Sequence, residues 1–175
     1  MGDEVINDVE RSCVFCCGSS WFAVPALSIR EVVERPVIVS VPNSSRVLVG
    51  LSHIRNEFVP VLSLQALLST DTQKTDQGNQ LILMSALAGP WALLVDCVES
   101  LESLELSINT DSPGHDSWSA AVLGSANCRG RIVRVIEPKA LYRLAAAVVS
   151  EASSREEKMS PLGPRQTVNL CGDPS

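Results

Sequence analysis

The amino-acid sequence predicts a mainly β domain with an aliphatic core. Apolar residues make up 45% of the 175 positions, which is enough to bury a core of ordinary size. Three Trp, three Phe and one Tyr leave most of that core to Val, Leu and Ile. Val-rich runs of about four to eight residues, broken by Pro, Gly, Ser and Asn, are typical of short strands rather than of long helices.

The first half of the chain is expected to form two hairpins and one short helix. Pro25 ends the second strand because it cannot donate to a sheet ladder. Ser63 is a suitable cap for a short helix. The expected elements are strands at 11–17, 21–24, 28–34 and 37–41, a hairpin within 50–64 and a helix at 63–68.

The hairpin within residues 50–64 is the most informative stretch. Apolar positions alternate on both sides of Arg55-Asn56-Glu57, as in two half-buried strands. Asn tolerates positive φ, so Asn56 is expected in the turn. The turn is therefore predicted to present Arg55 to solvent.

The second half repeats this organisation after a polar connector at 70–79. Pro138 is expected in the first turn of a closing helix, where its missing N–H is no loss. Residues 1–10 are expected to form a flexible leader, and residues 150–175, which lack an apolar period, a disordered tail. The expected elements are strands at 80–86, 91–99, 101–108, 118–126 and 131–136, a loop at 109–117 and a helix at 138–149.

Charge and hydropathy exclude several classes of function. The formal charge is −6, whereas binding to a phosphate backbone needs a basic stripe, so no nucleic-acid partner is expected. No apolar run is long enough to span a bilayer, and the first residues lack the basic and apolar regions of a signal peptide. The sequence therefore predicts a cytoplasmic protein without direct membrane insertion.

The six cysteines are expected to be reduced thiols in such a compartment. Cys13, Cys16 and Cys17 share the first strand, and the spacing of Cys13 and Cys16 would indicate a metal if a second pair matched it. Two interpretations stay open, a metal or redox site and small buried hydrophobic residues. No metal and no cofactor is predicted.

The sequence does not assemble an active site. His53 and His115 are the two histidines, and neither has a context that pairs it with a nucleophile. Asp96 and Glu99 are expected on opposite faces of one strand, which prevents them from acting as a carboxylate pair. The sequence therefore predicts a binding protein and not an enzyme.

Five motifs in order resemble the CheW-like family of coupling proteins over residues 11–148. The hairpin keeps the family's Gly50, its Ile54-Arg55 pair and the apolar run 59–61. Its remaining motifs are matched by Ile29-Arg30-Glu31-Val32, by Val41-Pro42-Asn43, by the strand 92–98 and by the closing strand 130–138.

The resemblance implies two five-stranded SH3-like barrels, the first at about 11–69 and completed by exchange with the second at about 80–136. It further implies a non-enzymatic adaptor that links the cytoplasmic helical tip of a chemoreceptor to the regulatory domain of a histidine kinase, in receptor arrays at the inner face of the membrane. The receptor tip would lie in the groove between the barrels, where it would meet Ile29, Glu31, Gly50 and Arg55. An apolar floor with a few charges to set the register suits recognition of a helix in a groove.

Structural roles for the same four residues stay open. Glu31 and Arg55 can pair with each other at the surface, Gly50 can serve a bulge, and Ile29 can belong to the core. The turn also departs from the family, because Glu57 beside Arg55 can neutralise the charge at the tip. Two other functions therefore remain, a CheW-like regulatory module of a two-component system not devoted to motility, and a cysteine-based metal or redox protein.

Overall fold

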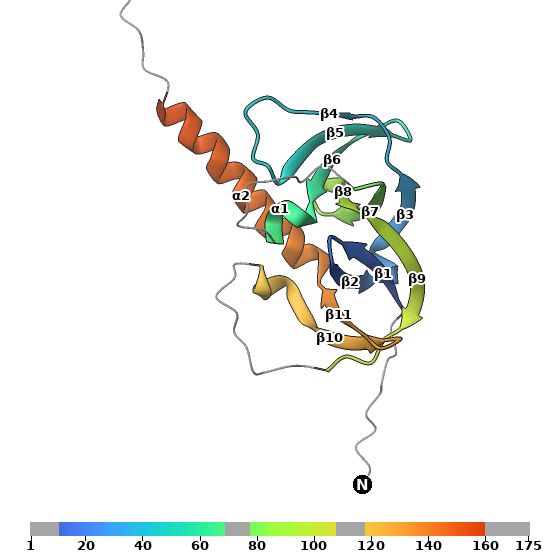
Figure 1. Cartoon of the computed structure of the whole chain (residues 1–175). Coiled ribbons are helices and arrows are strands. Elements are labelled where there is room, and N and C mark those ends of the chain that lie inside the picture. The colour runs from blue at the N-terminus through green and yellow to red at the C-terminus, as the bar shows by residue number, and fades with distance from the viewer. Residues whose placement is uncertain (1–10, 69–77, 108–117, 160–175) are drawn as a thin grey trace, which may run out of the picture.

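The computed structural model describes residues 11–68, 78–107 and 118–159 (Figure 1). The predicted leader at 1–10, the loop at 109–117, most of the polar connector and the last part of the predicted tail lie outside these residues. Eleven strands, two single-turn 3-10 helices and two α-helices are assigned within them. In chain order they are β1 (Arg11–Cys17), β2 (Ser20–Pro25), η1 (Ala26–Ser28), β3 (Ile29–Glu34), β4 (Ile38–Val39), β5 (Leu48–Ile54), β6 (Glu57–Ser63), α1 (Leu64–Leu68), β7 (Gln80–Ala86), β8 (Gly89–Val95), β9 (Cys97–Ser103), η2 (Ser119–Ala121), β10 (Val122–Cys128), β11 (Arg131–Ile136) and α2 (Pro138–Met159).

The strands form two sheets that exchange strands between the halves of the chain. The five-stranded sheet has the order β10-β11-β2-β1-β9, and the six-stranded sheet has the order β3-β7-β8-β6-β5-β4. Two parallel pairs, β2 with β11 and β6 with β8, connect strands of the first half of the chain to strands of the second half. All other pairs are antiparallel. The predicted mainly β fold is confirmed, with one sheet of five strands and one of six.

Chain connectivity forces the six-stranded sheet to curl. Strands β3 and β4 lie at its opposite edges, yet only residues 35–37 separate them. A flat sheet would hold its outer strands about 24 Å apart, whereas four extended Cα steps reach at most about 15 Å. The sheet must therefore bring its two edges toward each other.

The five-stranded sheet curls in the same way. Beyond β9 the chain returns to β10 through an isolated bridge, in which the Ser107 amide donates to the Ser125 carbonyl at 2.8 Å and the reverse bond is 3.2 Å. Both sheets are thus curled, and the five-stranded sheet meets itself at this bridge. Among the described residues neither sheet is the continuously closed barrel that was predicted.

Each curled sheet encloses a small apolar cluster, and the largest cluster lies between the sheets and α2. Strand β7 shows why its sequence is apolar throughout. Leu81 and Leu83 face the interior of the six-stranded sheet, whereas Ile82 and Met84 face the central cluster. A strand buried on both faces needs a continuous apolar run and not an alternating one.

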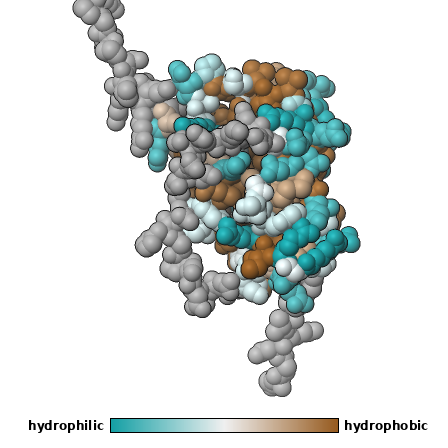
Figure 2. All heavy atoms as spheres, viewed as in Figure 1, coloured by the Kyte–Doolittle hydropathy of each residue, from teal (hydrophilic) through white to brown (hydrophobic). Residues whose placement is uncertain are grey.

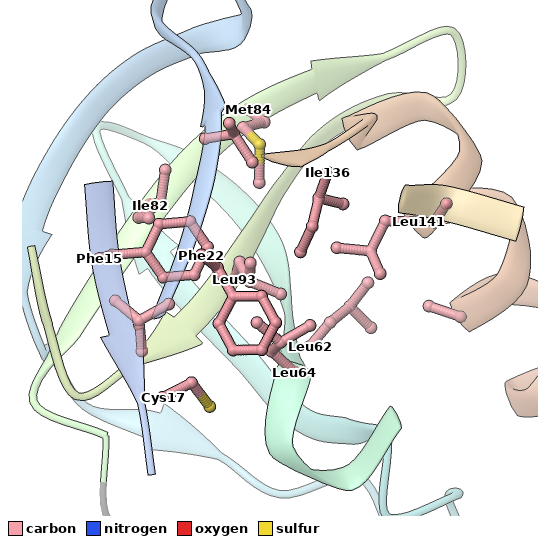
Figure 3. Close-up of a cluster of buried hydrophobic side chains, with 14 of the residues drawn as sticks. Phe15, Cys17, Phe22, Leu62, Leu64, Ile82, Met84, Leu93, Ile136 and Leu141 are labelled. Atoms are coloured by element: carbon pink, nitrogen blue, oxygen red, sulfur yellow. The ribbon is translucent and has the colours of Figure 1, made fainter. Parts of the chain in front are cut away.

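The central cluster collects side chains from both halves of the chain (Figure 3). Phe15 on β1 and Phe22 on β2 are fully buried, and their ring centroids are 6.0 Å apart. Leu141 and Ala145 bring the first turns of α2 onto the same cluster. The core therefore fastens the two sheets and the helix together.

Helix α2 extends further than predicted. It runs to Met159, beyond the expected end at residue 149, and leaves the body formed by the two sheets (Figure 1). The apolar period does end near Val149, but the following ten residues, SEASSREEKM, contain no Gly or Pro and include several strong helix formers. The segment 150–159 is therefore helix and not disordered tail.

Two further boundaries differ from the prediction. The expected strand over 91–99 breaks at Asp96, whose carboxylate accepts a 2.6 Å hydrogen bond from the Gly18 amide. Asp96 therefore lies in a bend between β8 and β9 and not on a strand with Glu99. The expected strand over 118–126 begins only at Val122, after the single turn η2.

Candidate protein-binding site

The β5–β6 hairpin ends in the tight turn that the sequence predicts. Arg55 and Asn56 have φ angles of 48° and 67°. Positive φ at both central residues is the mark of a type I′ turn, whose twist matches that of the flanking strands. The prediction for Asn56 is confirmed, and the Arg55 side chain is 76% exposed.

Two ion pairs hold this turn against strand β3. The Arg55 guanidinium donates to one carboxylate oxygen of Glu31 through Nη2 at 2.8 Å and through Nε at 3.0 Å. Glu57 accepts from Arg30 Nη1 at 3.2 Å. Glu57 therefore pairs with Arg30 and leaves Arg55 to Glu31. In one ion pair the arginine lies on β3, and in the other the arginine lies in the turn.

A bulge explains how neighbouring residues of β3 can both reach the turn. Residues in a regular strand alternate between faces, but the register of β3 with β7 shifts between Ile29 and Glu31. The extra residue is Arg30. The structure thus joins Glu31 and Arg55 as the sequence allowed. Glu57, which the sequence placed as a neutralising charge beside Arg55, pairs instead with Arg30, a residue for which no sequence signal was recognised.

Ile29 lines a hollow next to these ion pairs. The hollow is about 360 Å³ and lies between η1, the start of β3 and the start of α2. Ile29 is half-buried and packs against the central cluster, so it contributes both to the core and to the surface. The other lining residues are Leu27, Ser28, Arg30, Ser85, Glu137, Pro138 and Lys139.

A second hollow continues from the first along α2. It measures about 500 Å³, shares Ser85 and Lys139 with its neighbour, and reaches Tyr142 and Arg143 on the helix. Leu27 beside one hollow is 90% exposed, and Leu87 beside the other is fully exposed. The two hollows together form a groove with exposed leucines and three basic residues, Arg30, Lys139 and Arg143.

Gly50 lies away from this groove, beneath β4. It is buried at a bulge in the pairing of β5 with β6. A methyl group at its Cα would come within 2.2 Å of the Val39 carbonyl oxygen and 2.9 Å of the Ile38 side chain. The close approach of β4 therefore requires glycine at this position.

A turn in the second half repeats the charged hairpin. Arg129 and Gly130, between β10 and β11, also have positive φ, and Arg129 pairs with Glu102. The exposed fractions in that pair are 62% and 25%, close to the 76% and 22% of Arg55 and Glu31. Arg129 is therefore a natural control for Arg55.

The residue after that turn also forms an ion pair. Arg131 makes two hydrogen bonds to Glu99, of 2.9 and 3.1 Å, and lies 4.2 Å from the centre of the Trp21 ring. The hydrogen bonds to Glu99 raise the pKa of the Arg131 guanidinium. Glu99 is therefore engaged in this pair and is not aligned with Asp96.

A separate apolar surface lies on the six-stranded sheet. Hydrophobic residues gather at the end of the molecule where β4 and β5 lie (Figure 2). Val37 is 82% exposed, Val39 is 66% exposed and Phe58 on β6 is 74% exposed. The His53 ring contacts Phe58 at a centroid distance of 5.2 Å, so this histidine is half of a surface ring pair.

The cysteines of β1 divide between the two faces of the sheet. Cys13 and Cys17 are buried in the central cluster, while Cys16 points the other way. Residues three apart in a strand face opposite sides, so Cys13 and Cys16 cannot share a metal ion. Among residues 11–68, 78–107 and 118–159, no three His, Cys, Asp or Glu side chains are placed to hold one.

Burial changes the acidity of these thiols. It raises the pKa of Cys17 from its ordinary value of 9.0 to about 12, with a smaller contribution from the negative charge of Asp96. Burial and a hydrogen bond with Cys97 raise the pKa of Cys16 to about 11, and burial raises that of Cys13. All three groups are thus neutral thiols near pH 7.

The raised pKa of Cys17 predicts a loss of stability at alkaline pH. The thiol of the unfolded chain loses its proton near pH 9, while the folded protein keeps it until about pH 12. The unfolded state then binds fewer protons, so the free energy of unfolding falls across this window, by about 1 kcal/mol per pH unit for one thiol. Urea titrations at several pH values from 8 to 10 should show a shallower decline for Cys17→Ala than for the wild type, and equal slopes would contradict the assignment.

The comparisons with known proteins agree with this fold. A family model described as the CheW-like domain matches residues 11–146. The crystal structure of the scaffolding protein TtCheW from Thermoanaerobacter tengcongensis is similar, with a TM-score of 0.64 and 20% identity, covering 76% of this chain and 87% of that one. No curated protein matches the sequence. Within the described part of the chain, no helix is long and apolar enough to cross a membrane. The match spans most of the chain and includes both sheets, and the chain therefore belongs to the CheW-like domain family.

Proposed function

We propose that this protein is a non-enzymatic adaptor that couples the cytoplasmic tips of chemoreceptors to a histidine kinase. The observation that carries the proposal is the CheW-like match over residues 11–146, which includes both sheets and the start of α2. The similar structure is described as a scaffolding protein, which agrees with a role in assembly. An adaptor of this kind works in the cytoplasm, in receptor arrays at the inner face of the membrane.

The groove beside Ile29 suits a helical partner. It is long enough to include two adjoining hollows, and its exposed leucines can accept the spaced apolar anchors of an amphipathic helix. Lys139 and Arg143 add positive charge along the same groove, whereas Arg30 is paired with Glu57 and Glu137 adds one negative charge at the end nearer Ile29. We therefore assign this surface to the receptor tip and expect acidic residues on the helix that fills it.

Arg55 and Glu31 set the register of that partner at the end of the groove. An exposed ion pair contributes about 0–1 kcal/mol to folding, so its energetic role in the fold is small. A guanidinium held by one carboxylate keeps a fixed direction in which its other N–H groups can donate to a partner. Gly50 acts through the shape of the hairpin, since it lies beneath β4.

An adaptor must hold two partners at once, and a second surface serves that purpose. The exposed apolar residues of β4 and its surroundings, including Val39 and Phe58, line neither of the two hollows that form the groove. We assign this second surface to the regulatory domain of the kinase.

Arg55→Glu tests the assignment of the groove. The substitution puts a negative charge beside Glu31 and is expected to weaken binding of a receptor-tip fragment at least about tenfold, a change of about 1.4 kcal/mol. The melting temperature should change by no more than about 2–4 °C, because the lost pair is exposed. Calorimetric titration of the full chain with receptor-tip and kinase fragments encoded by the same genome provides the measurement.

Two control variants separate position from charge. Arg129→Glu makes the same change in the equivalent turn of the second half and should leave the affinity for the receptor tip unchanged. The double variant Arg55→Glu with Glu31→Arg restores an ion pair but reverses it, so it should remain weak if the partner reads these charges. Restored binding in the double variant, or wild-type binding by Arg55→Glu, would show that the pair only shapes the hairpin. If the protein binds a kinase fragment but no receptor fragment, the result would favour the alternative function, a CheW-like regulatory module of a two-component system not devoted to motility.

A further inference from the structure

Two cysteines from opposite halves of the chain face each other at the surface of the five-stranded sheet. Cys16 on β1 and Cys97 on β9 are directly opposite residues in an antiparallel pair, although they are 81 positions apart in sequence. Their Sγ atoms are 2.6 Å apart. Cys16 is half-buried and Cys97 is exposed.

The backbone already has the geometry that a disulfide requires. Directly opposite residues of antiparallel strands have Cα atoms about 4.5–5.5 Å apart, which lies within the 4.4–6.8 Å or so that disulfides span. A disulfide bond is about 2.05 Å long, so the two sulfur atoms need to approach by only about 0.5 Å. A small rotation of the side chains achieves this without moving either strand.

The other described cysteines do not compete for this partner. Cys13 and Cys17 point into the central cluster, and Cys128 is buried among the residues enclosed by the five-stranded sheet. Cys97 is thus the cysteine among the described residues that a reagent in solution reaches most easily. Cys16, next to it and partly covered, is placed to react with it afterwards.

We propose that Cys16 and Cys97 form a reversible disulfide when the protein meets a peroxide. The Cys97 sulfur attacks one peroxide oxygen, so that the O–O bond breaks, an S–O bond forms and one water leaves. The Cys16 sulfur then attacks the Cys97 sulfur, so that the S–O bond breaks, the S–S bond forms and a second water carries away the Cys16 proton. The two thiols lose two electrons and hydrogen peroxide gains them. A dithiol reductant reverses the step by exchange.

The bond would connect the two halves of the chain. Strand β1 belongs to the first hairpin, and β9 begins directly after the bend at Asp96 in the second half. A cross-link across 81 positions restricts the unfolded chain strongly, so the oxidised protein should unfold at a temperature about 5–15 °C higher than the reduced protein. Oxidation would therefore stiffen the sheet that joins the halves.

Treatment of the reduced full-length protein with one equivalent of hydrogen peroxide tests the proposal. The intact mass should fall by two hydrogen atoms, peptide mapping should show the Cys16 and Cys97 peptides joined, and the melting temperature should rise. Dithiothreitol should reverse all three changes. Stable addition of oxygen to Cys97 without cross-linking, or a bond to any other cysteine, Cys171 included, would overturn it.

Matched serine variants identify the thiols and the role of the fold. Cys16→Ser and Cys97→Ser should each abolish the mass loss and the rise in melting temperature, whereas Cys13→Ser and Cys128→Ser should retain both. Peroxide treatment in concentrated urea should give mixed disulfide pairs, because the register of β1 and β9 is lost. An equal yield of the Cys16–Cys97 bond in urea and in buffer would show that the folded geometry does not direct the reaction.

Discussion

Replacing Phe22 with alanine is expected to lower the free energy of unfolding by about 3–5 kcal/mol. The Phe22 ring is fully buried, stacks on Phe15 and lies in the cluster shared by both sheets and α2. Its strand, β2, also forms the parallel joint with β11. Truncation therefore leaves a cavity at the point where the main parts of the fold meet.

Phe58→Ala is the matched control for this prediction. Phe58 is also a phenylalanine on a strand, but it is 74% exposed and contacts the His53 ring at the surface. Its truncation should cost about 1 kcal/mol or less. Urea unfolding of both variants gives the comparison, and similar losses for the two would show that the central cluster is not the main source of stability.

Replacing Gly50 with alanine is expected to cost about 3 kcal/mol or more, or to detach β4. The new methyl group would approach the Val39 carbonyl oxygen to 2.2 Å, and that atom belongs to the backbone, which cannot rotate away as a side chain does. Either β4 moves or the bulge in β5 is lost, and both changes break hydrogen bonds at the sheet edge.

Gly89→Ala separates this steric effect from backbone strain. Gly50 has a φ of 157° and Gly89 a φ of 125°, but a methyl group at Gly89 would meet no atom within 4 Å. Its replacement should cost only the strain of the unusual conformation, about 1–3 kcal/mol. Unfolding free energies and hydrogen exchange of the Ile38 and Val39 amides would distinguish the two variants. Unchanged protection of these amides together with a small loss for Gly50→Ala would contradict the packing argument.

Local patterns predicted the individual elements well. The alternation around Arg55 predicts the β5–β6 hairpin, and the tolerance of Asn56 for positive φ predicts its turn, because both depend on residues close in sequence. The motifs around Gly50 and Pro138 are likewise local. The family resemblance, which the CheW-like match over 11–146 confirms, supplied the arrangement of the two halves.

Features that depend on distant residues were not visible in the sequence. The pairing of Cys16 with Cys97 requires the register of β1 with β9, and the pairing of Arg30 with Glu57 requires the curl of a whole sheet. The end of α2 was misplaced for another reason. Beyond Val149 the helix continues through residues that favour helix but show no apolar period in the sequence, so the pattern used for the prediction gave no signal there.

The parallel joint between β2 and β11 has a consequence for synthesis on the ribosome. Trp21 of the first hairpin lies opposite Val133, within the last strand of the domain. Strand β2 must therefore wait for its parallel neighbour until almost the whole domain has been translated, and the edge of β2 that β11 covers stays open until then. During most of its synthesis, a nascent chain of this architecture therefore exposes a strand edge that other chains can bind. Pairing with β11 removes this exposed edge at the end of synthesis.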